Sequence, residues 1–155
     1  MSTNRAWRIF RRMEYSAFAA AALIYAACAT HAWRVLPDAA AIKLQRIVLF
    51  PGFFFLFTLV IGLVAPPFRH ALKTHLWISF RTGFGQSVIS VLAVVLVLGF
   101  FAGFIYLDTA QAAHRGGAFP GSAFCAYAAG VGVLLAQAVL VRRLEQDPVL
   151  GSKIG

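Results

Sequence analysis

Histidines carry the clearest chemical potential in this sequence, because paired imidazoles on facing helices can ligate haem iron. The chain has histidines at four positions: His31, His70, His75 and His114. Such a pair must lie at one depth. His31, expected at the end of the first apolar run, and His114, expected in the loop after the third, come nearest, because both fall on the same side of the bundle. Two interpretations stay open. The pair binds a tetrapyrrole, or these are interfacial histidines that face water or a partner.

Other reactive side chains are few. The chain has five acidic residues and two cysteines. We expect Cys28 and Cys125 to be small apolar fillers with free thiols, although a disulfide between them is geometrically conceivable. Glu14 and Asp108 are expected at opposite edges of the apolar segments, which leaves no ionisable residue in their interiors. Because proton-coupled carriers usually need such a residue, the sequence disfavours a self-contained transporter. No catalytic motif is present, so the sequence predicts a protein that is not an enzyme.

Composition places the chain in the membrane. Of its 155 residues, 61% are hydrophobic and 12% are charged, and the mean hydropathy is +0.79. These values exclude a soluble enzyme domain, a disordered chain and a disulfide-stapled secreted module. The net charge is +9. The basic residues lie in short segments between apolar runs, so they indicate membrane topology and no nucleic-acid partner.

Four apolar segments are long enough to cross the bilayer, which takes about 20 residues. They cover residues 16–33, 47–65, 86–107 and 122–141. The predicted fold is an all-α, integral membrane four-helix bundle, with one domain over 1–155 and short loops. Pro51 falls inside the second span and should kink it, because proline removes a backbone hydrogen bond. Asp38 is expected to cap the helix that leads into that span.

Basic residues set the expected orientation. With the N-terminus placed in the cytoplasm, ten of the 14 Lys and Arg residues fall on the cytoplasmic side and four on the other. This asymmetry predicts that both termini are cytoplasmic. The expected location is the bacterial inner membrane. Between the second and third spans, residues 68–81 are predicted to form an interfacial helix. Its Arg69, Lys73 and Arg81 would contact phospholipid headgroups or a soluble partner.

Small residues at a spacing of four create faces for close helix packing. Gly99 and Gly103 form one such face on the third span, and Ala126 and Gly130 form another on the fourth. These faces dock a partner helix, or they pack within the bundle itself. The phenylalanine-rich residues 49–57 likewise allow two interpretations, a groove for a quinone, a carotenoid or an acyl chain, or a lipid-exposed helix.

These features favour a non-catalytic accessory subunit of a larger inner-membrane complex, whether respiratory, photosynthetic or secretory. Its partners would be other membrane subunits and phospholipids. A haem- or pigment-binding redox protein that uses His31 and His114 is the alternative. A small homo-oligomeric transporter or lipid-handling protein is the second alternative. The cofactor is left open by the sequence.

Overall fold

The computed structural model describes the backbone of residues 3–67, 70, 84–115 and 121–145, and their side chains except at 3–11, 84–91, 93–94, 141 and 144–145. Within these ranges every regular element is helical. The helices are α1 (Thr3–Val35), α2 (Ala40–Leu44), a π-helical turn (Gln45–Leu49), α3 (Phe50–Val64), α5 (Phe84–Arg115) and α6 (Ser122–Glu145). The predicted interfacial helix at 68–81, with Arg69, Lys73 and Arg81, lies outside the described residues.

Four helical segments are long and apolar enough to cross a membrane, and the chain is therefore a multi-pass membrane protein. They are Arg12–Val35, Ala40–Val64, Val95–Arg115 and Ser122–Leu140. Each overlaps one of the four predicted spans. Large apolar side chains cover the outer surface of the bundle, with Leu23 71% exposed and Leu96 73% exposed. Such an apolar exterior is what lipid tails require of a helical bundle.

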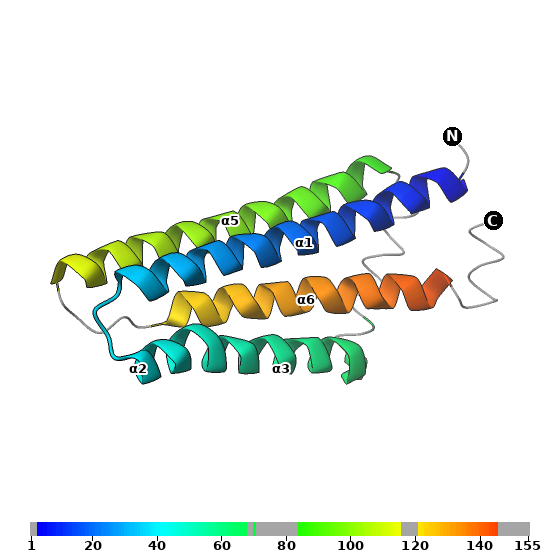
Figure 1. The fold of residues 1–155 in the computed structure, drawn as a ribbon. Helices are drawn as coiled ribbons and strands as arrows, with labels where there is room; N and C mark the ends of the chain where they lie inside the picture. Colours follow the sequence, from blue (N-terminus) through cyan, green and yellow to red (C-terminus); the bar gives the residue numbers. More distant parts are fainter. Residues whose placement is uncertain (1–2, 68–69, 71–83, 116–120, 146–155) are drawn as a thin grey trace.

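The four helices lie roughly side by side as an up-and-down bundle (Figure 1). α1 and α5 run in one direction, and α3 and α6 run in the other. The start of α1 and the end of α6 therefore lie at the same end of the bundle. This arrangement follows from four consecutive spans that each reverse the direction of the chain.

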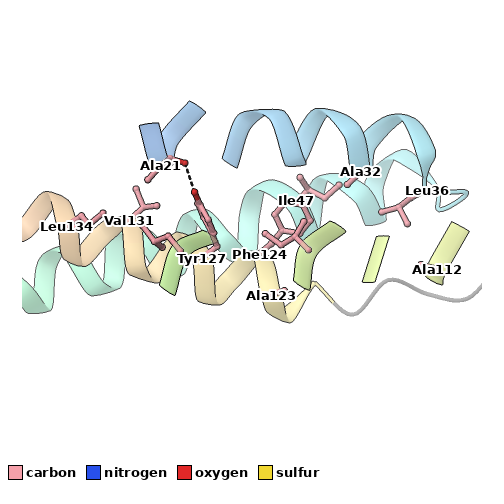
Figure 2. Close-up of a cluster of buried hydrophobic side chains, with 12 residues drawn as sticks. Ala21, Ala32, Leu36, Ile47, Ala112, Ala123, Phe124, Tyr127, Val131 and Leu134 are labelled. Carbon is pink, nitrogen blue, oxygen red and sulfur yellow. Dashed lines mark hydrogen bonds between the residues drawn. The ribbon is translucent and has the colours of Figure 1, made fainter. Parts of the chain in front are cut away.

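α6 is the central helix. It lies between the α1–α5 pair on one side and α3 on the other (Figure 1). More than half of its apolar segment is buried, against less than a quarter in each of the other spans. Its alanines and glycines explain this position, because small side chains let neighbouring backbones approach closely in lipid. Phe124 and Tyr127, both 0% exposed, fill the core at one end of the helix (Figure 2).

The second span is continuous from α2 through the π-helical turn into α3. The turn at Gln45–Leu49 ends two residues before Pro51, and the Phe50 amide donates a hydrogen bond to the Gln45 carbonyl five residues earlier. A π-turn is a common way for a helix to accommodate a local irregularity. Pro51 thus sits in a helix that reorganises its hydrogen bonds around it, while the bend itself stays a prediction.

Two local predictions were wrong. Asp38 does not cap α2: the cap position is Ala39, which has extended dihedral angles (φ −60°, ψ 147°) and no side-chain cap. His114 is in the last turn of α5 and not in a loop. α5 continues past Leu107 because Thr109 and Ala112 extend its buried stripe, at 0% and 8% exposure. The buried residues at helical spacing therefore extend α5 about two turns beyond the end that hydropathy predicts.

Candidate functional site

An aromatic cluster joins α1 to the N-terminal end of α6. The Tyr25 ring lies 5.6 Å from the Phe124 ring, edge to face, and 5.8 Å from the Tyr127 ring. The Tyr127 hydroxyl donates a hydrogen bond of 2.8 Å to the Ala21 carbonyl on α1 (Figure 2). Tyr127 therefore buries an apolar ring and still has an acceptor for its hydroxyl group. The contacts of these tyrosines could not be predicted from the sequence, because a single Tyr in an apolar run has no characteristic spacing to other residues.

Tyr25 also reaches the second span. Its hydroxyl donates a hydrogen bond of 2.6 Å to the Ile47 carbonyl. Pro51, four residues after Ile47, has no amide hydrogen to offer that carbonyl. Since unsatisfied carbonyls are costly in lipid, the Tyr25 hydroxyl replaces the donor that proline removes. This hydrogen bond could not be predicted from the sequence, because Tyr25 and Ile47 are 22 residues apart and lie on different spans.

α3 and α6 meet at a glycine. A Cβ atom added to Gly132 would lie 2.6 Å from the Phe55 carbonyl oxygen and would also collide with the Thr58 hydroxyl. The Thr58 hydroxyl lies 3.1 Å from the Ala129 carbonyl on α6, and it is also within hydrogen-bond distance of two carbonyls of its own helix. Only glycine at position 132 permits this backbone approach.

The predicted small-residue faces differ from one another in the structure. On α6, Ala126 is half-buried and Gly130 packs against α5, since an added Cβ would lie 2.9 Å from the Leu98 Cδ2 atom. On α5, Gly99 and Gly103 are exposed, and a Cβ added to either would have no atom within 4 Å among the described residues. The α6 face is used inside the bundle, whereas the α5 face points away from it.

Two aromatic side chains flank the exposed glycines of α5. Phe100 is 63% exposed and Phe104 is 45% exposed, and their ring centroids are 4.9 Å apart. Gly99, Phe100, Gly103 and Phe104 together are called the α5 glycine face below. It combines a shallow strip of exposed backbone with an aromatic ridge, and none of its four residues is charged.

The two candidate haem ligands lie at different levels. The His31 ring stacks on the Tyr106 ring of α5, at 5.7 Å between centroids. His114 follows Tyr106 by eight residues, which is about 12 Å along the helix axis. Both histidines are exposed. The tetrapyrrole interpretation stays a prediction, and the stacking gives His31 an aromatic partner on α5.

Glu14 is the residue whose burial differs most from the expectation. It lies near the start of the Arg12–Val35 span, yet it is 4% exposed, inside the bundle. The Gln137 side-chain amide on α6 donates a hydrogen bond of 2.7 Å to Glu14 Oε1. Glu14 precedes the apolar run that begins at residue 16, so its burial inside the bundle was not predicted. α1 already packs on α6 two residues before that run begins.

Metal and redox chemistry have few candidates among the described residues. No group of three or more His, Cys, Asp or Glu side chains lies close enough there to hold a metal ion. Cys28 and Cys125 are half-buried free thiols on α1 and α6. Thr109, the other buried polar residue, donates its hydroxyl hydrogen to the Ile105 carbonyl of its own helix at 2.6 Å.

Comparison with known protein families, characterised proteins and solved structures found no match to this chain.

Proposed function

We propose that this chain is a non-catalytic accessory subunit of a larger complex in the bacterial inner membrane. Its role would be to pack against a transmembrane helix of another subunit and to stabilise the assembly. The observation that carries the proposal is the α5 glycine face, which stays unfilled although the equivalent glycines of α6 are packed inside the bundle.

Glycine in a helix interior is unfavourable by about 1 kcal/mol relative to alanine. Gly130 and Gly132 offset that cost through close contacts within the chain. Gly99 and Gly103 make no such contact with the described residues. Lipid gives them no compensation either, because lipid tails fill space equally well around alanine. A partner helix that approaches the exposed backbone supplies the missing contacts.

The chemistry of the face specifies the occupant. Gly99, Phe100, Gly103 and Phe104 form an uncharged surface in which exposed backbone lies beside two exposed aromatic rings. The best complement is an apolar transmembrane helix of another subunit, with its own small residues opposite the ridge. The basic residues Arg69, Lys73 and Arg81 would contribute contacts to headgroups or to soluble subunits, and the partners identified with this chain would name the complex.

The test is co-purification with the α5 glycine face blocked. In the double variant Gly99→Leu and Gly103→Leu, the open space around both positions should let the bundle fold, while the leucines prevent close approach of a partner helix. We expect partner subunits to be lost when the chain is isolated from its own membranes in mild detergent. Gly52→Leu is the matched control, because position 52 also has no atom within 4 Å of an added Cβ among the described residues. Unchanged co-purification of the double variant would contradict the proposal.

A further inference from the structure

A carboxyl group is buried in the seam between α1 and α6. Glu14 continues the inward-facing stripe of α1 that Ala17 and Ala21 form, and these alanines are 8% and 4% exposed. Opposite, Gln137 is half-buried on α6, between the buried Ala136 and Ala138. Among the described side chains, the surroundings of Glu14 are therefore apolar apart from one amide.

Only half of the Glu14 carboxyl group has a partner. Gln137 Nε2 donates to Oε1 at 2.7 Å, whereas Oε2 is buried and has no hydrogen-bond partner among the described residues. If the buried carboxyl group were ionised, a charged oxygen would have no hydrogen bond. This costs far more free energy than a neutral hydroxyl oxygen without a hydrogen bond. Unsatisfied buried atoms of this kind are uncommon in proteins and need an explanation.

No described cation compensates a charge at this position. On α1, Arg12 is exposed. On α6, the nearest basic residues after Gln137 are Arg142 and Arg143, which are also exposed and start about 7.5 Å further along the axis. The α1 side chains before Arg12, which include Arg8 and Arg11, and the α5 side chains of residues 84–91 lie outside the described part. The amide of Gln137 is neutral and provides a hydrogen bond without balancing a negative charge.

We propose that Glu14 is a proton-binding site that holds a neutral carboxylic acid in the resting bundle. The carbonyl oxygen Oε1 accepts the Gln137 hydrogen bond, and Oε2 carries the proton. Ionised glutamate inside a transmembrane bundle requires water or a counter-ion, so release of the proton is coupled to opening of the α1–α6 seam. The ligand is the proton itself, and the site gives the bundle a proton-responsive contact in addition to its packing role.

Infrared spectroscopy tests the proposal on the full chain in lipid. The chain contains two glutamates, Glu14 and Glu145, so carboxyl-labelled ¹³C-glutamate introduced by cell-free synthesis marks only these groups. Glu145→Gln leaves Glu14 as the single glutamate of the chain. At neutral pH we expect the carbonyl stretch of a protonated carboxylic acid, shifted by the label and present in Glu145→Gln.

Two further variants complete the assignment. Glu14→Gln should remove the band, and Gln137→Leu should keep it but move it to higher frequency, because the carbonyl oxygen loses its hydrogen bond. A labelled glutamate signal that appears only as carboxylate at neutral pH would overturn the proposal. A carboxylate signal that responds to added sodium or potassium would overturn it in favour of a cation site.

Discussion

Replacement of Gly132 by alanine tests the packing of the central helix most sharply. The added Cβ would lie 2.6 Å from the Phe55 carbonyl oxygen, about 0.8 Å inside the 3.4 Å at which ordinary contact begins. The neighbour is backbone, which cannot rotate away, so α3 and α6 must separate. Insertion of one carbon into a tightly packed interface costs about 1–3 kcal/mol. Separation would also weaken the contact between Thr58 and the Ala129 carbonyl.

Gly103→Ala is the matched control. Both substitutions gain the same helix propensity of about 1 kcal/mol, but position 103 has no atom within 4 Å of an added Cβ among the described residues. The difference between the two variants therefore isolates the packing cost at Gly132. We expect Gly132→Ala to be less stable than Gly103→Ala by about 1–3 kcal/mol.

The assay can use the protein's own thiols. Cys28 and Cys125 are free and half-buried, so a thiol-reactive fluorophore reports unfolding in mild detergent as these side chains become accessible. Denaturation curves for the wild type, Gly132→Ala and Gly103→Ala give the two differences in unfolding free energy. Equal stability of the two variants would refute the close approach of α3 and α6.

Three further predictions follow from the hydrogen bonds and the topology. Tyr25→Phe should destabilise the bundle by about 1 kcal/mol. The cost should be smaller in a Pro51→Ala background, because the new amide of residue 51 can bond to the Ile47 carbonyl. A double-mutant cycle measures this coupling, and equal costs in both backgrounds would contradict the replacement of the missing donor by Tyr25. Thr58→Val should cost about 0.6 kcal/mol by loss of the contact with Ala129, and an unchanged denaturation midpoint would count against that hydrogen bond. Reporter domains fused to either end should both be active in the cytoplasm, and activity of either fusion on the opposite side would reverse the predicted orientation.

The spans could be predicted because a bilayer imposes a length and a polarity that a single sequence displays. Four helical segments overlap the predicted spans. Their ends differ from the prediction where buried contacts between helices continue beyond the apolar run. α5 runs on to Arg115 because Thr109 continues its buried stripe. α1 already packs on α6 at Glu14, before its apolar run begins.

The sequence could not predict which helix faces pack together, because the same small-residue motif occurs on a face buried in the bundle and on an exposed face. Gly99 and Gly130 each belong to a small-residue face, yet Gly130 packs on Leu98 and Gly99 points outward. Nothing local distinguishes them, since the difference depends on which helix becomes central. Contacts between distant residues, such as Tyr25 with the carbonyl freed by Pro51, likewise require the tertiary arrangement.

Native mass spectrometry of the chain isolated in mild detergent from its own membranes tests the proposed role most directly. The accessory-subunit account predicts a mass far above any small multiple of 16.8 kDa, with other chains present. The masses of those chains would identify the complex. A monomer or a small homo-oligomer would contradict the account, and an added mass of a few hundred daltons would then indicate a bound ligand.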